Sequence, residues 1–221
     1  MGRAHSESLI ANGWDKGLDY KKIKRKFTNE IDRVYNNIRD LSEENATIFD
    51  RKKRMLVKKL IYLTISVIQL VNGSRVTEAI NAFKIFLKDK DFNEKVVVKI
   101  GKSDSLKTTR QGEQFRLKPR FRHMKFPIQY VNNKIIKLID GSDALEQVLE
   151  CNCLKRCLCN YLTRHFNCNT HSLRYAFINY LLYDMKIEMP AVAKFVGHVD
   201  CSQMVRYSQR KQIDKIFNLD L

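Results

Sequence analysis

Apolar residues recur along this chain at the intervals expected of helices. Between residues 18 and 41, five of them fall on one face with charged residues between, which predicts a basic amphipathic helix. They are Ile23, Phe27, Ile31, Val34 and Ile38. A second, more uniformly apolar helix is expected over residues 48–71. Its longest apolar run is shorter than the ~20 residues that cross a bilayer, so we expect a buried helix and no membrane partner.

Caps, turns and valine-rich stretches mark the other elements. Asn72-Gly73-Ser74 predicts a tight turn before a helix that starts beside Arg75. Further helices are expected from Ser142 to Phe166, after Thr170, and from Pro190 to Gly197. Strands are expected at residues 95–100, 114–117 and 123–128. The predicted fold class is mainly α with a small antiparallel β-sheet (α+β).

The charge favours a polyanionic partner over a small neutral ligand. Lys and Arg number 41 against 24 Asp and Glu, for a formal net charge of +17. Residues 90–137 alone hold 13 basic and 4 acidic residues. Double-stranded DNA is the expected partner of such a chain.

The length of 221 residues suits one well-buried core with an extra arm. We expect residues 1–47 to form an N-terminal arm and the basic amphipathic helix, and residues 48–221 to form the main domain with a C-terminal tail. The basic helix either packs on that domain, clamps DNA or leads to a missing domain, and the residues leave these alternatives open.

The six cysteines are interpreted as reduced thiols of an intracellular protein, because the first residues have no apolar core of the length of a secretory signal. Four of them fall at positions i, i+2, i+6 and i+8, namely Cys151, Cys153, Cys157 and Cys159. On one helix this spacing points the thiols in different directions, and no C-x-x-C pair occurs. No metal and no cofactor are therefore expected.

Polar residues interrupt the apolar segments between residues 170 and 207, where burial of an unpaired charge would be costly. They are His171, Arg174, His198 and Tyr207. His171 and Arg174 would share one edge of a helix capped by Thr170, and the positive end of that helix favours an anion. Arg75 stands at another helix start, where Glu78 is placed to orient its guanidinium.

Basic residues also gather in a segment expected to form a hairpin, GKSDSLKTTRQGE at residues 101–113. Lys102 and Lys107 are its candidates for reaching a phosphate, and a diffuse contact to a DNA backbone is the alternative for either one. The expected DNA-binding residues are Lys99, Lys107, Arg110, Arg120 and Arg122.

Four motifs stand in order: N-G-S-R-V-T-E around Arg75, the basic hairpin, H-S-L-R-Y from His171, and V-G-H ending at His198, with Tyr207 nine residues later. They resemble the catalytic domain of the tyrosine recombinases, the phage integrase family that includes the Cre and Xer proteins. The family's boxes read T-G-x-R-x-x-E, H-x-L-R-[HY] and L-G-H before the tyrosine. Here Asn72 replaces the threonine and Val196 the leucine. The resemblance covers about residues 48–210, so residues 48–221 are the expected catalytic domain.

The resemblance implies transesterification at a phosphodiester. Two guanidiniums, from Arg75 and Arg174, would clamp the non-bridging oxygens. Tyr207 would attack the phosphorus and form a phosphotyrosine. Tyr175 and Tyr183 compete for this role, but Tyr207 alone has the family's spacing from His198.

The same resemblance assigns the proton transfers. His171 is the expected proton acceptor and His198 a hydrogen-bond partner of the phosphate. Lys102, in preference to Lys107, would protonate the departing 5′-oxygen. A carboxylate cluster for two-metal catalysis is not evident in the sequence, which agrees with a metal-free mechanism.

The expected function is that of a site-specific DNA recombinase or integrase that works through a covalent 3′-phosphotyrosine, as a homo-tetramer on two DNA duplexes. The alternatives are a type IB topoisomerase or telomere resolvase, and a non-catalytic DNA-binding protein derived from a recombinase. The residues after 207 would pack on a neighbouring subunit or on their own domain. The composition, rich in Lys, Asn and Ile, points to a mobile element or virus, and to a location with DNA in a prokaryotic cytoplasm or a eukaryotic nucleus.

Overall fold

The computed structural model describes residues 18–41, 46–101, 106–108, 112, 114–116 and 118–198, and the side chains of these except at 46–49, 106–108 and 114–116. The helices are α2 (Tyr20–Asp40), α3 (Ala46–Asn72), α4 (Val76–Asp89), α5 (Asn133–Asp140), α6 (Asp143–Leu149), α7 (Leu154–Phe166), α8 (Thr170–Asn179), a π-helical turn (Tyr180–Asp184) and α9 (Met189–Val196). The strands are β1 (Lys95–Lys99), β2 (Leu106–Thr108), β3 (Gln114–Arg116) and β4 (Phe121–Lys125). The predicted class, mainly α with a small antiparallel sheet, is confirmed.

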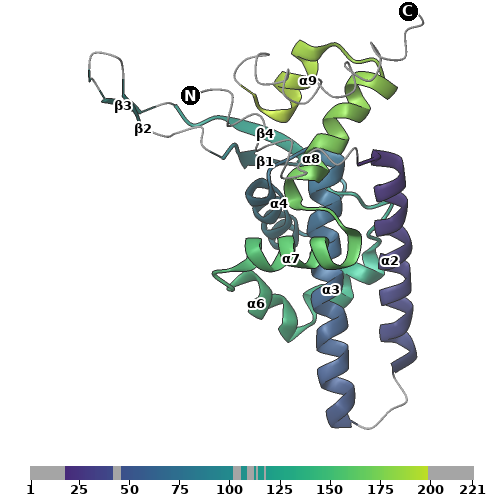
Figure 1. Ribbon diagram of the computed structural model, residues 1–221. Coiled ribbons are helices and arrows are strands. Elements are labelled where there is room, and N and C mark those ends of the chain that lie inside the picture. Colours follow the sequence, from purple (N-terminus) through teal and green to yellow (C-terminus); the bar gives the residue numbers. More distant parts are fainter. Residues whose placement is uncertain are drawn as a thin grey trace, which may run out of the picture.

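Helix α3 is the centre of the core, and α2, α4, α6 and α8 pack against it (Figure 1). Among the described residues it is also the helix long and apolar enough to cross a membrane, over Asp50–Asn72. Within the protein, however, 67% of that apolar window is buried. The expectation of a buried core helix agrees with this packing.

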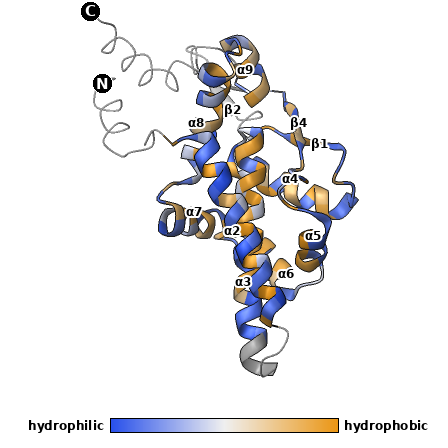
Figure 2. Ribbon diagram, turned by 90° about the vertical axis from the view of Figure 1, so that its right-hand side faces the viewer, coloured by the Kyte–Doolittle hydropathy of each residue, from blue (hydrophilic) through white to orange (hydrophobic). Residues whose placement is uncertain are grey.

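Helix α2 has the predicted apolar face. Ile23, Phe27, Ile31, Val34 and Ile38 are each at most 5% exposed and belong to the main core. Asp19 caps the helix by accepting a hydrogen bond from the Lys22 amide at 2.7 Å. Both hydrophilic and hydrophobic residues occur along α2 and α3 in Figure 2, as expected for helices with one buried face.

The strands form two antiparallel pairs. β1 pairs with β4, with Lys95 opposite Lys125 and Lys99 opposite Phe121. β2 pairs with β3, and this hairpin extends away from the helices (Figure 1). The expected strand at 123–128 in fact begins at Phe121. β2 was not predicted, because its three residues lie in a polar segment without alternation.

The single helix expected from Ser142 to Phe166 is wrong. α6 ends at Leu149 and α7 begins at Leu154, so that Cys151 and Cys153 lie in the connection. Neither glycine nor proline marks the break, and apolar residues continue at helical spacing on both sides of it. Helix α5 was missed as well; Asn132 caps it by accepting from the amides of Lys134 and Ile135.

Candidate active site

The turn between α3 and α4 places Arg75. Gly73 has a left-handed backbone with φ of 53°, and a Cβ there would overlap the ring of Phe177. The Asn72 side chain donates to the carbonyls of Ile68 and Lys125 and accepts from the Lys125 amide at 3.0 Å. It thereby joins the end of α3 to β4. Arg75 follows as the N-cap of α4, with 31% of its side chain exposed.

Glu78 is the buried acceptor at this corner, with a side chain only 1% exposed. One carboxylate oxygen accepts from Arg75 Nη1 at 3.0 Å and from the Gly101 amide at 3.1 Å. The other accepts from the Arg75 amide at 3.1 Å and lies 3.5 Å from Arg122 Nη1. The expectation that Glu78 orients Arg75 is confirmed by these contacts. Glu78 also holds Gly101, the residue before Lys102.

Arg174 is buried on α8, with 1% exposure. Its Nη1 donates to the Gly73 carbonyl at 2.6 Å, and its Nη2 donates to the Val196 carbonyl at 2.9 Å. The same Nη2 lies 2.9 Å from His198 Nε2. Arg174 therefore connects the turn that carries Arg75 with the end of α9.

The start of α8 is capped by Asn169, whose side chain accepts from the amides of His171 and Ser172 at 2.9 Å. The expectation that Thr170 is the cap is wrong by one residue. Gln69, a polar residue in the buried part of α3, donates to the Thr170 carbonyl at 2.6 Å. The first turn of α8, and with it His171, is thus fixed to α3.

Burial lowers the pKa of His171 to about 4, and the positive charges of Arg174 and Arg75 and the neighbouring His198 act in the same direction. His171 is therefore neutral at pH 7. Its ring also packs edge-on against Tyr175, with 5.1 Å between ring centroids. A neutral imidazole beside two guanidiniums can accept a proton, and a bound anion would make it more basic.

His198 emerges directly after α9, as predicted. Gly197 ends the helix with φ of 78°, and a Cβ there would come within 2.9 Å of Ile100 Cδ1. The His198 amide donates to the Ala193 carbonyl at 2.9 Å. This close approach of α9 to the residue after β1 directs His198 toward Arg174.

Arg122 belongs to the site, although the sequence had suggested a position on the DNA-binding surface for it. It was expected to bind DNA, but its side chain is only 4% exposed, so a direct surface contact is not expected of it. It donates to the carbonyls of Asn72 and Val196, and its guanidinium carbon lies 5.4 Å from the centre of the Phe195 ring. Burial lowers its pKa to about 10 while Glu78 opposes the shift, so Arg122 stays charged at neutral pH.

The other expected residues lie around or beyond this cluster. Lys99 is exposed at the end of β1, and Arg120 is half-buried, with its carbonyl accepting from the Ile100 amide at 2.8 Å. Lys107 lies in β2, and its side chain is not described. Lys102, Arg110 and Tyr207 lie outside the described residues.

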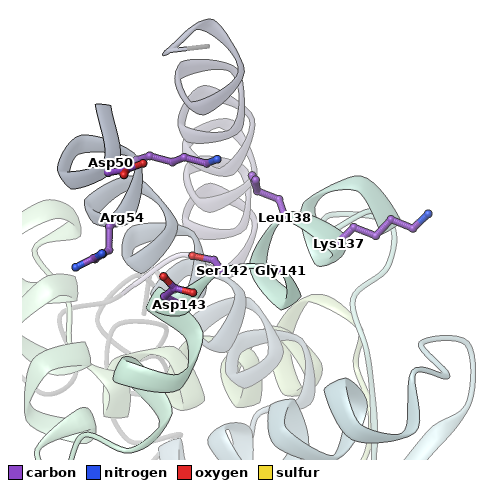
Figure 3. A pocket seen from close by; sticks show the side chains of 8 residues that line it. Asp50, Arg54, Lys137, Leu138, Gly141, Ser142 and Asp143 are labelled. Atoms are coloured by element: carbon purple, nitrogen blue, oxygen red, sulfur yellow. The ribbon is translucent and has the colours of Figure 1, made fainter. Parts of the chain in front are cut away.

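A polar hollow at the other end of α3, toward α5 and α6, contains none of these residues (Figure 3). Its lining mixes both charges, from Asp50, Lys53, Arg54, Lys137 and Asp143, with Leu138, Gly141 and Ser142. The arginine cluster, made of Arg75, Arg122 and Arg174, is different in kind. Glu78 contacts two of its guanidiniums, those of Arg75 and Arg122, whereas Arg174 is held by the carbonyls of Gly73 and Val196, so positive charge is in excess there. That excess of positive charge suits an anion.

Comparison with known proteins decides the family. The chain is 40% identical over 210 residues to "Putative integrase V10" of Sputnik virophage, a match that covers 95% of this chain and 91% of that protein. The chain belongs to the tyrosine recombinase family. The chain is also similar to "Putative integrase ORF241" of Acidianus two-tailed virus, 24% identical over 91% of this chain and 66% of that protein.

Two other proteins also resemble the chain. "Uncharacterized protein MJ0770" of Methanocaldococcus jannaschii is 27% identical over 96% of this tyrosine recombinase and 91% of its own length. A crystal structure of the XerH site-specific recombinase, bound to its palindromic difH substrate after cleavage, aligns with a TM-score of 0.48 at 17% identity. That alignment covers 91% of this chain and 52% of the XerH chain. No family model matches the sequence.

Proposed function

We propose that this protein is a site-specific DNA recombinase that cleaves and rejoins double-stranded DNA through a 3′-phosphotyrosine intermediate. The observation that supports it best is the convergence of Arg75, Arg174, His171 and His198, which lie up to 123 positions apart in the chain. In the family resemblance, Arg75, Arg174 and His198 contact the phosphate and His171 accepts the tyrosine proton.

The proposed phosphate position lies between the two guanidiniums of Arg75 and Arg174. Negative charge grows on the non-bridging oxygens as the phosphorus becomes five-coordinate, and positioned guanidiniums stabilise it. Arg174 is already fixed by two carbonyls and Arg75 by Glu78, so little reorganisation accompanies the reaction. His198, 2.9 Å from Arg174, would donate to the same phosphate.

Tyr207 is the proposed nucleophile and Lys102 the proposed acid, on the family resemblance. The tyrosine oxygen forms a bond to phosphorus, and the bond from phosphorus to the 5′-oxygen breaks. His171 takes the tyrosine proton, and Lys102 gives a proton to the 5′-oxygen. Attack of a 5′-hydroxyl from a second strand reverses the step, releasing Tyr207 and joining the strands.

DNA is the proposed partner because the net charge is +17 and because the relative that is 40% identical carries the name of a putative integrase. We further propose assembly as a tetramer on two duplexes, and a location with DNA inside the host. Lys99, Lys107, Arg110 and Arg120 are the proposed contacts to the DNA backbone.

A suicide substrate tests the proposal. A nick placed just downstream of the cleavage site lets the short fragment that carries the freed 5′-hydroxyl diffuse away, which prevents rejoining and traps the covalent adduct. A library of nicked duplexes is prepared from DNA of the host and of the mobile element. Each duplex is incubated with the protein without added divalent cation, and the adduct is resolved on a denaturing gel. We expect an adduct with the wild type and with Tyr183→Phe, and none with Tyr207→Phe. An adduct that survives Tyr207→Phe, or binding of every duplex without any adduct, would overturn the proposed chemistry. Joined products from two separate duplexes then distinguish a recombinase from a topoisomerase.

A further inference from the structure

Three cysteine sulfurs meet where α6 turns into α7, away from the arginine cluster. Cys151 Sγ lies 3.1 Å from Cys153 Sγ, and Cys153 Sγ lies 3.4 Å from Cys157 Sγ. All three sulfurs lie within 4.8 Å of one another, and all three residues are free thiols. Cys159, two positions farther along α7, does not belong to this group.

The break between α6 and α7 makes this arrangement possible. On a continuous helix, Cys151 and Cys153 would point in nearly opposite directions. This was one of the two reasons for expecting no metal there, the other being the lack of a C-x-x-C pair. In the structure both precede α7, and the Leu154 amide donates to the Cys151 carbonyl at 3.0 Å, which closes a tight turn. The turn places these two thiols over the first turns of α7, beside Cys157. The spacing argument against a metal therefore does not apply.

We propose that Cys151, Cys153 and Cys157 form a binding site for Zn²⁺, with three thiolate ligands and a fourth position filled from outside this trio. Zinc binds thiolates at ~2.3 Å in a tetrahedral arrangement, which separates neighbouring sulfurs by about 3.8 Å. The observed separations of 3.1 and 3.4 Å need only small side-chain rotations to reach that value. Cys153 is exposed, so an ion can enter from solvent.

The surroundings suit the charge of such a site. Three thiolates and one Zn²⁺ carry a net charge of −1, and the site stands at the positive end of α7, where Cys153 is the N-cap. Lys155 and Arg156 follow in the first turn of that helix. Each thiol that is protonated beforehand releases its proton when the ion binds, so affinity rises with pH.

The proposed ion would fix the turn before α7 to the first turns of that helix. Burial and the neighbouring cysteines raise the pKa of Tyr62 on α3, and its ring lies 5.4 Å from that of Tyr161 on α7. Leu149 and Cys151 are partly buried against the core here, and a metal would add a crosslink at the same turn. This role is structural and is separate from the phosphate chemistry proposed above.

Metal analysis of the full-length protein tests the site. Protein purified with a non-thiol reductant is equilibrated with Zn²⁺, freed of excess ion by gel filtration, and analysed for zinc and protein by mass spectrometry. We expect one Zn²⁺ per chain in the wild type and in the matched control Cys159→Ser, and loss of that ion in Cys153→Ser and in Cys157→Ser. Equal zinc content in wild type and both cluster variants overturns the proposal.

Co²⁺ substitution provides a measurement that does not rely on the folding of a variant. Thiolate ligands give bound Co²⁺ an intense near-ultraviolet charge-transfer band, whose intensity grows with the number of sulfurs. We expect wild-type protein to show the intensity of three thiolates and Cys159→Ser to match it. A wild-type spectrum without the band, or with the intensity of a single thiolate, contradicts the assigned site.

Discussion

Replacing Glu78 with glutamine should weaken the fold far more than its small change in shape suggests. Four donors converge on the carboxylate: the Arg75 and Gly101 amides, Arg75 Nη1 and Arg122 Nη1. Glutamine keeps one acceptor oxygen and turns the other into an amide donor that faces N–H groups. The charge of Arg122, with 4% of its side chain exposed, then loses its partner.

The magnitude follows from burial. Removing one partner of a buried ion pair costs about 3–5 kcal/mol, and the pair with Arg75 adds less because Arg75 is 31% exposed. Since glutamine retains one acceptor, we expect a loss of about 3 kcal/mol in the free energy of unfolding. For a chain of this size that loss lowers Tm by about 6–12 °C.

Thermal unfolding followed by circular dichroism measures the effect, and Glu30→Gln is the matched control. Glu30 also pairs with an arginine three residues on, Arg33, at 2.6 Å, but that pair is at the surface with side chains 22% and 61% exposed. Its loss should cost less than ~1 kcal/mol. If the two variants lower Tm equally, burial is not what makes the Glu78 contacts matter.

Three further outcomes are expected. Gly73→Ala should lower Tm much more than Gly112→Ala does. Both glycines have positive φ, but of the two only Gly73 has a side chain, Phe177, where a Cβ would lie. The difference between the two melting temperatures therefore measures the steric cost. Arg122→Met should abolish adduct formation on the suicide substrate while leaving non-specific DNA binding within about twofold, because its guanidinium is buried behind the site; a large loss of DNA affinity would instead mean that it contacts DNA. The folded protein holds the pKa of His171 near 4, below its ordinary value of 6.5, so the unfolded chain binds the extra proton and stability should fall as pH drops from about 6.5 toward 4. Melting curves at pH 7 and pH 5 should show a smaller fall in Tm for His171→Asn than for wild type, and equal falls would contradict the assignment.

The elements that could be predicted from the sequence are those whose position is set by a single local property of the sequence. The apolar face of α2 and the left-handed glycines that end α3 and α9 follow from periodicity and from backbone sterics, and both were found. The break between α6 and α7 was missed because its apolar residues keep helical spacing across it, and the tertiary packing that ends α6 leaves no mark in the local sequence.

Arg122 was misplaced for a different reason. A basic residue in a basic segment is ordinarily at the surface, yet β4 turns Phe121 outward with 59% exposure and Arg122 inward. The strand alternates exposed and buried positions, which puts Arg122 on the same face as the buried Met124. The alternation along the strand could therefore have identified Arg122 as a buried residue.

Gln69 is a second residue whose role the sequence could have indicated. A polar residue inside a buried apolar run needs a hydrogen-bond partner, and here the partner is the Thr170 carbonyl at the start of α8.

The Val196 carbonyl, which accepts from both Arg174 and Arg122, ties anion binding to the position of α9. An anion that draws on Arg174 Nη2 competes with the last turn of that helix for the same donor. Linkage of this kind is reciprocal. The factor by which displacement of α9 changes the affinity for the anion equals the factor by which the bound anion changes the equilibrium constant for that displacement. The segment that follows this helix carries Tyr207, eleven residues after Val196. Occupancy of the anion site and the position of the last turn of α9 are therefore coupled through one donor, Arg174 Nη2.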